Sequence, residues 1–177
     1  MTRISIREAV PSDAEKLIAY MKRIGGETDN LSYGAEGMRI TVEQEEGFLR
    51  HMQEDEHSVF FCAWKGADLV GTANLSGMPR RMSHRAELGI SVIKSEWNNG
   101  IGAMLMQHIV DYAKEHGIEI VNLEVRSDNE SAIHLYERFG FKNTGTIPAF
   151  FRIDDEYFDF DIMSLDLRHY QNRGKTG

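Results

Sequence analysis

The pattern of apolar and polar residues predicts strands and helices that alternate along the chain. Seven segments either alternate apolar with polar residues or form short apolar runs, as strands do. These segments are residues 3–7, 59–64, 69–75, 85–93, 120–126, 141–146 and 157–167. Helical spacing of apolar residues marks four more segments, which begin near Pro11, Thr41, Gly100, and Asn129 or Ser131. The order predicts one mixed α/β domain over residues 1–170, with a disordered tail at 171–177.

Residues that commonly begin and end helices support these boundaries. Ser12-x-x-Glu15 and Thr41-x-x-Gln44 match the capping box, in which two side chains satisfy free backbone N–H groups at a helix start. The glycine pair at residues 25–26 is expected to end the first helix, and Gly117 to end the third. Residues 65–68 (Lys-Gly-Ala-Asp) predict a hairpin turn between two strands.

The run from Ser91 to His116 predicts the end of a strand, a turn at Gly100–Gly102 and an amphipathic helix. The helix is expected to bury one face, formed by Ile101, Met104, Leu105, His108, Ile109 and Tyr112. Such a turn leaves unpaired N–H groups at the positive end of a helix, and its glycines let a phosphate approach them. From this stretch alone, ligand binding and simple helix entry are equally open.

Two common phosphate loops are excluded. The dinucleotide fingerprint Gly-x-Gly-x-x-Gly requires glycine at position 105, where the chain has Leu105, and no Gly-Lys-Ser/Thr of a P-loop is present. The turn therefore requires a different phosphate-bearing cofactor. Because it carries no reactive side chain, it is expected to hold a ligand rather than to transform it.

Composition places the chain among ordinary globular proteins. With 177 residues, 41% hydrophobic and 27% charged, it is long enough for one domain with a substantial core. No apolar run reaches the length of a membrane span, and no signal-peptide pattern is present. The single cysteine, Cys62, lies in an apolar run, so we expect a buried thiol in a cytoplasmic protein.

The net charge of the chain narrows the classes of binding partner. A net charge of −8 argues against nucleic acid, which requires clustered Lys and Arg. The charge is compatible with a cationic amine substrate, although an acidic surface commonly serves solubility alone. The seven histidines are scattered, without His-Glu-x-x-His or a Cys–His cluster, so no metal site is expected.

Two glutamates are candidates for a general base. Because side chains alternate along a strand, Glu87 shares a face with Ser91, and Glu124 shares a face with Asn122. If the two strands are neighbours, both carboxylates border one cleft, where desolvation would raise the pKa toward the range useful for a base. The alternative is two outward charges on half-solvated strands.

Tyr136 and Asn129 lie on the helix that follows. Tyr136 is a candidate general acid for a leaving group that departs as an anion, or a packing residue with a satisfied hydroxyl. Asn129 is a helix cap or a contact for an extended ligand.

These pieces together resemble the GNAT superfamily of acetyl-CoA-dependent N-acetyltransferases. Trp97-Asn98-Asn99-Gly100-Ile101-Gly102 resembles its Gln/Arg-x-x-Gly-x-Gly/Ala pyrophosphate loop, and Asn129-x-x-Ala132-x-x-Leu135-Tyr136-x-x-x-Gly140-Phe141 resembles its second cofactor motif. The resemblance is close over residues 85–141 and loose elsewhere. Trp97 stands where the family has Gln or Arg, which removes one side-chain contact from a loop that works through its backbone.

The resemblance implies an acyl-CoA N-acyltransferase fold, in which a mixed sheet is splayed between the strands at 85–93 and 120–126. Acetyl-CoA, the co-substrate, would lie in the opening, its pantetheine arm paired with the earlier strand, where an N–H would polarise the acetyl carbonyl. The implied cofactor-binding residues are Val92, Ile93, Trp97, Asn98, Asn99, Gly100, Ile101, Gly102, Ala103 and Asn129.

The resemblance also implies direct transfer of the acetyl group to a primary amine of a small molecule or peptide. Tyr136 would protonate the CoA thiolate, and Glu87 or Glu124 would deprotonate the amine, directly or through water. We place Glu87 ahead of Glu124. The loop at 26–38, the basic loop around Arg80 and the aromatic residues 149–151 with Tyr157 are expected to edge the acceptor pocket.

Three other hypotheses remain open: a protein N-terminal acetyltransferase, a non-catalytic acyl-CoA-binding module, and a protein-interaction domain that uses the aromatic residues near Phe150. The oligomeric state is also open, and an edge-strand homodimer is common in the family.

Overall fold

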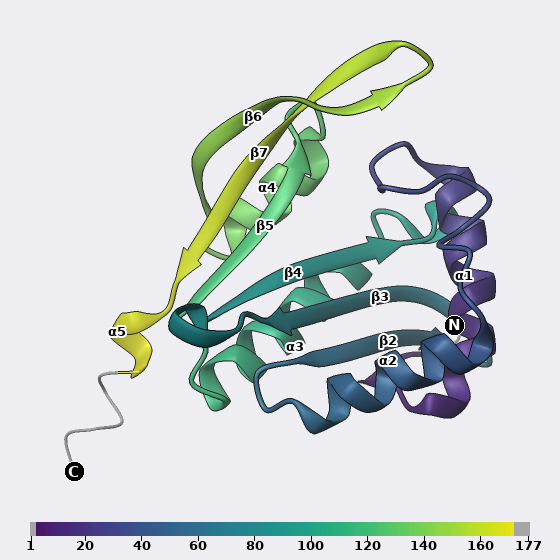
Figure 1. The fold of residues 1–177 in the computed structure, drawn as a ribbon, viewed down its shortest axis with the longest axis horizontal. Coiled ribbons are helices and arrows are strands. Elements are labelled where there is room, and N and C mark those ends of the chain that lie inside the picture. The colour runs from purple at the N-terminus through teal and green to yellow at the C-terminus, as the bar shows by residue number, and fades with distance from the viewer. Residues whose placement is uncertain (1–2, 172–177) are drawn as a thin grey trace.

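The computed structural model describes residues 3–171 and contains the predicted strands and helices in the predicted order (Figure 1). The strands are β1 (Ile4–Glu8), β2 (Val59–Lys65), β3 (Asp68–Gly77), β4 (Arg85–Val92), β5 (Ile120–Arg126), β6 (Lys142–Ile153) and β7 (Glu156–Asp166). The helices are α1 (Ala14–Glu27), α2 (Val42–Glu54), α3 (Ile101–Glu115), α4 (Glu130–Arg138) and the short α5 (Arg168–Gln171). Of the predicted tail, Gln171 ends α5, and residues 172–177 lie outside the described residues.

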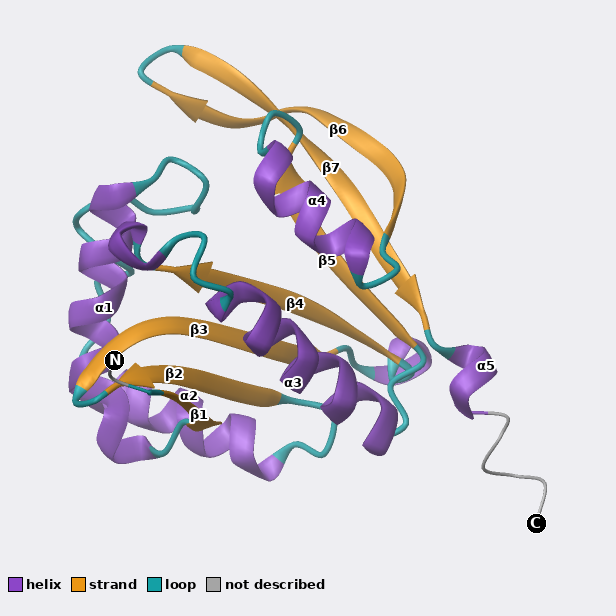
Figure 2. Ribbon diagram, turned by 180° about the vertical axis from the view of Figure 1, so that it is seen from behind, coloured by secondary structure: helices purple, strands orange, loops and turns teal. Residues whose placement is uncertain are grey.

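The strands form one seven-stranded sheet in the order β1-β2-β3-β4-β5-β7-β6. Only β4 and β5 run parallel, and they pair only at their beginnings, where Glu87 is opposite Asn122 in the last pair. Beyond this pair the two strands diverge, so the sheet opens into a V (Figure 1). Helices α1 and α2 cover one face of the sheet, and α3 and α4 cover the other (Figures 1 and 2). The splayed mixed sheet that the sequence predicts is confirmed.

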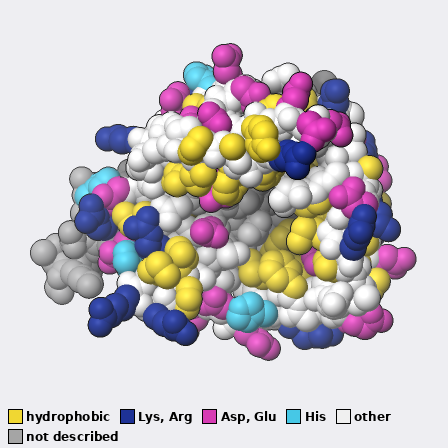
Figure 3. All heavy atoms as spheres, turned by 45° about the horizontal axis from the view of Figure 1, so that its top comes forward, with side chains coloured by type: hydrophobic (Ala, Val, Ile, Leu, Met, Phe, Trp, Pro, Cys, Tyr) yellow, Lys and Arg dark blue, Asp and Glu magenta, His cyan; other side chains and the backbone are white. Residues whose placement is uncertain are grey.

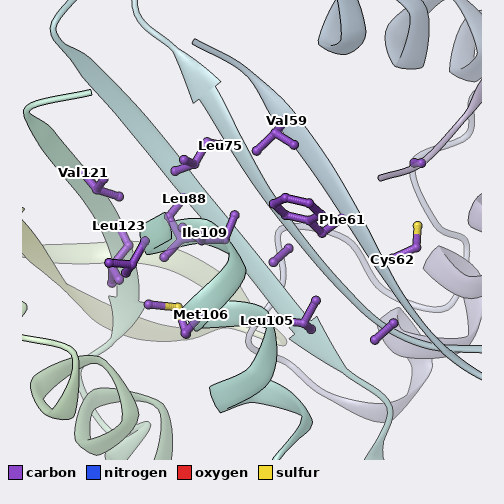
Figure 4. Packing of buried hydrophobic residues seen from close by; sticks show 14 of the residues in the cluster. Val59, Phe61, Cys62, Leu75, Leu88, Leu105, Met106, Ile109, Val121 and Leu123 are labelled. Atoms are coloured by element: carbon purple, nitrogen blue, oxygen red, sulfur yellow. The ribbon is translucent and has the colours of Figure 1, made fainter. Parts of the chain in front are cut away.

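The main hydrophobic core lies between α3 and the sheet (Figure 4). Leu105 and Ile109 of α3 are fully buried, as are Leu75 of β3 and Val121 of β5. Burial of each such side chain stabilises the fold by about 1.5–3 kcal/mol. The core therefore holds α3 against the strands on both sides of the V.

The buried face of α3 differs from the predicted one. Met104 is 39% exposed and His108 is exposed, whereas Met106 and Val110 are buried. Figure 4 shows Leu105 on the β3 side of the helix and Met106 on the β5 side. Because α3 packs beneath both halves of a splayed sheet, its buried face is broader than the single stripe that periodicity predicts.

The predicted capping box at the start of α1 is wrong. A short 3-10 turn at Pro11–Asp13 precedes the helix, and the Asp13 carboxylate, not Ser12, accepts the backbone N–H of Val10 at 2.9 Å. Asp13 also forms a two-pronged ion pair with Arg7 at 2.7 and 2.8 Å. Asp13 therefore caps the start of this turn, and its carboxylate is held in place by Arg7 of β1. The spacing of residues in the sequence does not reveal this pairing.

Gly25 does not end α1 but lies inside it. An added Cβ at this position would be 2.0 Å from the carbonyl oxygen of Gly34. The glycine is required because the loop between α1 and α2 passes directly against the helix. At the other predicted helix ends the expectations are confirmed: Thr41 and Gln44 exchange hydrogen bonds at 2.8 and 3.2 Å, and Gly117 has a φ of 71°.

β6 and β7 form a hairpin that is much longer than predicted (Figure 1). The pairing skips from Ile147 to Phe151, and Ala149 between them has a φ of 51° and donates its N–H to the Asp159 carboxylate at 2.8 Å. This bulge admits Pro148 without ending the strand. The aromatic residues near 150 therefore lie on a strand, not in a loop.

Candidate active site

The turn before α3 presents backbone N–H groups. Asn98 and Gly100 have positive φ angles of 63° and 78°, and no side chain caps α3. The first N–H of the helix to bond back is that of Met104, which donates to Gly100 O at 3.0 Å. The three preceding amides, those of residues 101–103, have no such acceptor within a helix. The turn therefore has the geometry of an anion site.

Side-chain bonds from α1, from β2 and from within the turn itself hold this turn. The Glu27 carboxylate accepts the Lys94 backbone N–H at 2.7 Å. Lys65 Nζ lies 2.7 Å from one oxygen of Glu96, and the Asn99 amide donates to the other at 3.2 Å. The hydrogen bond from Lys65 lowers the pKa of Glu96. The backbone of the turn is therefore preorganised by α1 and β2.

The turn opens into a cleft of about 770 Å³. Its walls are the end of β4 (Ile90–Val92), the turn and first residues of α3 (96–98 and 100–103), one face of α4 and the loop after α1. α4 approaches closely, because a Cβ on Gly102 would lie 3.2 Å from Leu135. All but two of the predicted cofactor-binding residues line this cleft; Ile93 and Asn99 do not.

The open edge of β4 supplies further backbone groups. Ile93 donates its N–H to Val70 O on β3 at 3.0 Å. Because groups in an antiparallel pair alternate between the two edges of a strand, those of Ile90 and Val92 point away from β3, into the V. The Ile93 amide is therefore used within the sheet. Ile90, which the sequence analysis missed, follows from Val92 by the two-residue period of a strand.

Glu87 and Glu124 lie at the vertex of the V. Both are exposed on the face that carries α1 and α2, and neither forms a hydrogen bond or ion pair with the described residues. Partial burial raises the pKa of the Glu124 carboxyl, and the negative charge of Glu87 raises it further. The structure thus brings the two carboxylates near each other, but neither is among the residues that line the cleft beside the turn, which the sequence analysis expected them to border. Figure 3 shows this side of the molecule hollowed across its middle, with apolar side chains around the hollow.

Tyr136 of α4 lines the cleft beside the turn and lies on the face of the sheet opposite to the two glutamates. Its ring is 7% exposed, and burial raises the pKa of its hydroxyl to about 12. The hydroxyl has no hydrogen-bond partner among residues 3–171, nor is it among the fully enclosed polar atoms. It is therefore protonated at neutral pH and directed at the cleft rather than at a protein acceptor.

One face of α4 contributes residues that the sequence analysis missed. Ser131, His134 and Arg138 line the cleft with Leu135. Their spacing of three and four residues is the signal that places them on one helical face. Asn129 caps the helix, since its Oδ1 accepts the Ala132 N–H at 3.3 Å, and it also lines the cleft. Both interpretations of Asn129 therefore coexist.

Of the segments that were expected to edge the acceptor pocket, the loop after α1 lines this cleft and the others do not. Thr28, Asn30 and Leu31 of the loop after α1 line the cleft, whereas Arg80 and the aromatic residues of β6 do not. Phe150 and Phe151 instead pack on Phe160, with ring centroids 4.9 and 4.2 Å apart. A separate cavity of about 640 Å³ near α5 contains none of the predicted site residues.

Two structural features are absent from residues 3–171. No group of three or more His, Cys, Asp and Glu side chains there is arranged to hold a metal ion. No helix in the same part of the chain is both long and apolar enough to cross a bilayer.

Comparison with solved structures agrees with this geometry. An acetyltransferase of the GNAT family from Streptococcus pneumoniae matches with a TM-score of 0.90 and 30% identity, over 93% of this chain and 99% of that one. A putative acetyltransferase from Salmonella typhimurium, solved with acetyl-CoA, matches with a TM-score of 0.81 over 93% and 94% of the two chains. At 17% identity, the second likeness concerns the fold alone.

Sequence relatives point the same way. N-alpha-acetyltransferase RimI of Mycobacterium tuberculosis is 33% identical over 98 residues, 55% of this chain and 60% of that protein. The [ribosomal protein bS18]-alanine N-acetyltransferase of Escherichia coli is 32% identical over 78 residues, 44% of this chain and 53% of that protein. The chain thus matches little more than half the length of these relatives.

The family model described as "Acetyltransferase (GNAT) family" matches residues 28–141, which include the turn, both glutamates and α4. The match confirms the resemblance seen in the two sequence motifs. This chain belongs to the GNAT family of acetyltransferases, whose acetyl donor is acetyl-CoA.

Proposed function

We propose that this protein transfers the acetyl group of acetyl-CoA directly to a primary amine of a small molecule or peptide. One observation carries the proposal: the pKa of Glu124 is raised, and the residue lies on β5 two positions past the last pair that joins β4 to β5, where the sheet begins to open. A donor entering from the α3 side and an amine entering from the α1 side would meet there.

The donor fits the cleft by its chemistry. Its diphosphate would accept hydrogen bonds from the backbone N–H groups of residues 101–103 at the positive end of α3. Its pantetheine arm carries amides, which would pair with the free groups of Ile90 and Val92 as an added strand does. Since the Ile93 amide is used within the sheet, the N–H of Val92 is the group that would polarise the acetyl carbonyl.

The chemical step then requires one base and one acid. Glu124 removes a proton from the ammonium group, and the amine lone pair attacks the acetyl carbon to form a tetrahedral intermediate. Collapse of the intermediate breaks the C–S bond, and the electron pair leaves with sulfur. The second proton on nitrogen passes to water, which gives the neutral amide. Tyr136 donates its proton to that thiolate, and its high pKa ensures that the proton is present at neutral pH.

We prefer Glu124 to Glu87 as the base, which reverses the order suggested by the sequence. A base that works near neutral pH requires a pKa above that of an ordinary carboxyl, and partial burial raises the pKa of Glu124 in that direction. Glu87 contributes to that shift through its negative charge. The two carboxylates also form an acidic surface that favours a cationic acceptor.

Both acceptor classes in the proposal have support from relatives. The RimI-like relatives are named for protein N-terminal acetylation, and a streptothricin acetyltransferase from Streptomyces lavendulae, 32% identical over 56% of this chain, is named for a small molecule. Protein N-termini and small-molecule amines are therefore both candidate acceptors for the proposed site.

The test combines an acceptor screen with matched variants. Thiol release from acetyl-CoA is measured with polyamines, amino acids, aminoglycosides and short peptides. Glu124→Gln should lower kcat by about 100-fold or more on the best acceptor. The control, Glu115→Gln, changes an exposed glutamate at the far end of α3 and should leave kcat unchanged. Binding of desulfo-CoA without thiol release on any acceptor would instead identify a non-catalytic binding module.

A further inference from the structure

Trp97 forms a hydrogen bond that bears directly on the donor cleft. Its indole Nε1–H donates to the carbonyl oxygen of Val92 at 2.7 Å. The ring is 44% exposed and lines the cleft beside Gly100 and Ile101. The chain's other tryptophan, Trp64, is buried on β2.

The Val92 carbonyl, which accepts the hydrogen bond from Trp97, lies on the open edge of β4. Ile93 bonds to β3, so the backbone groups of its neighbour Val92 point into the V. An extended ligand with amide groups that adds to this edge needs such carbonyls as acceptors. The indole N–H is therefore placed where a ligand amide N–H would bind.

The surroundings of Trp97 allow its side chain to move while its backbone stays fixed. The residues just before it are held to α1, through Lys94 with Glu27 at 2.7 Å, and Glu96 is held to β2 by Lys65. The Lys94 Nζ lies 5.9 Å from the centroid of the indole ring, and Trp97 is 44% exposed. Because the Trp97 side chain is solvent-exposed, water can satisfy the indole N–H when it leaves Val92.

We propose that Trp97 competes with the donor's pantetheine arm for the Val92 carbonyl. When the arm adds to the edge of β4, one of its amide N–H groups replaces the indole N–H, and the Trp97 side chain swings out of the cleft. The position that carries a glutamine or arginine in the family motif is thus a side chain that opposes donor binding in this chain. The inference rests on the proposed function, because it requires that the donor bind along β4.

Calorimetry on Trp97→Phe tests the competition. Phenylalanine keeps an aromatic ring but lacks the N–H, so desulfo-CoA should bind about fivefold more tightly than to the parent protein, the equivalent of one net hydrogen bond. The matched ligand is adenosine 3′,5′-bisphosphate, which has phosphates and adenine but no pantetheine arm. It should bind the parent protein and the variant equally.

Each outcome separates the two proposals. Unchanged or weaker binding of desulfo-CoA by Trp97→Phe would overturn the competition and leave the donor site intact. Equal tightening for both ligands would also overturn it, because the effect would not arise at Val92. Failure of the parent protein to bind desulfo-CoA would overturn the proposed function and this inference together.

Fluorescence gives a second measurement. Desulfo-CoA should change the tryptophan emission of the parent protein as Trp97 leaves its bond. Trp97→Phe retains only Trp64 and should show no change on binding. An equal change in the parent protein with adenosine 3′,5′-bisphosphate would show that phosphate binding alone moves Trp97, and would contradict the proposal.

Discussion

The two sides of the V are built by different means. The donor side consists mainly of backbone groups from one short stretch, the end of β4 and the start of α3. A hydrogen bond to Glu27 of α1 and an ion pair with Lys65 of β2 hold this stretch in place. The acceptor side consists of side chains from strands that pair only at their beginnings, up to Glu87 and Asn122. The donor side thus depends on local geometry, and the acceptor side depends on where distant segments meet.

The difference has a consequence for function. A site made mainly of backbone groups binds the constant part of a substrate, because most of its contacts cannot be exchanged by substitution without moving the fold. A site made of side chains on diverging strands and a loop can change its acceptor by substitution. We therefore expect variants on the two sides to separate donor affinity from catalytic rate and acceptor choice.

The largest effect is expected for Tyr136→Phe, which should lower kcat by about 100-fold. The phenol is the proposed proton donor, and its removal leaves the thiolate unprotonated as it departs. The dissociation constant of desulfo-CoA should not change, because the hydroxyl bonds to no described residue. Tyr112→Phe, which removes a hydroxyl that donates to the Ser58 carbonyl away from the cleft, serves as the control in the thiol-release assay. Equal kcat values for Tyr136→Phe and the parent protein would remove Tyr136 from the mechanism.

Gly102→Val should weaken donor binding by about tenfold, as expected for overpacking at a tight contact. The added side chain would meet Leu135, which lies 3.2 Å from the Cβ position, and would push α4 away from the turn. Calorimetry with desulfo-CoA measures the change. Gly47→Ala, which meets nothing within 4 Å, is the control and should leave donor binding unchanged. A rise in the KM for the amine alone would contradict the division between the two sides.

Glu87→Gln should move the acidic limb of the pH profile of kcat/KM to lower pH. Glu124 must be deprotonated to act as a base, and the negative charge of Glu87 raises its pKa. Removing that charge lowers the pKa, so more Glu124 is deprotonated in acid. If Glu87 were itself the base, the same variant would lose activity at every pH, which distinguishes the two assignments.

The smallest effect is expected for Lys65→Met, which removes an ion pair that holds the donor turn. Since Lys65 is 40% exposed, donor binding should weaken by only about twofold. The bond lowers the pKa of Glu96, so its contribution is present at neutral pH and is lost as the pH falls below the usual carboxyl range. The parent protein and the variant should therefore converge in acid. A larger loss in acid than at neutral pH would contradict this assignment.

Local patterns predicted local features well. The strand at 120–126 has the bounds that its alternation indicated, Asn129 caps α4, and Thr41 forms its capping box with Gln44. Each of these depends on residues within one or two turns of chain, and the interactions that decide them are present before the rest of the protein folds.

Features that depend on contacts between different elements of the fold were predicted poorly. Gly25 is explained by Gly34 across a loop, the start of α1 by a pair between Asp13 and Arg7, and the length of β6 by its pairing with β7 across a bulge. The raised pKa of Glu124 likewise arises only where β4 and β5 bring Glu87 near it. The pattern of residue types along the chain does not specify how far apart the helices and strands lie in the folded protein.

By itself, the sequence determined the donor half of this protein: the family, the anion-binding turn and the cofactor motifs, because backbone geometry is encoded by glycines and caps within short stretches. Only the tertiary structure decided which carboxylate has the raised pKa, which β4 groups face the V and what Trp97 bonds to. These depend on desolvation and on contacts between strands that diverge, and both arise only when the sheet is assembled.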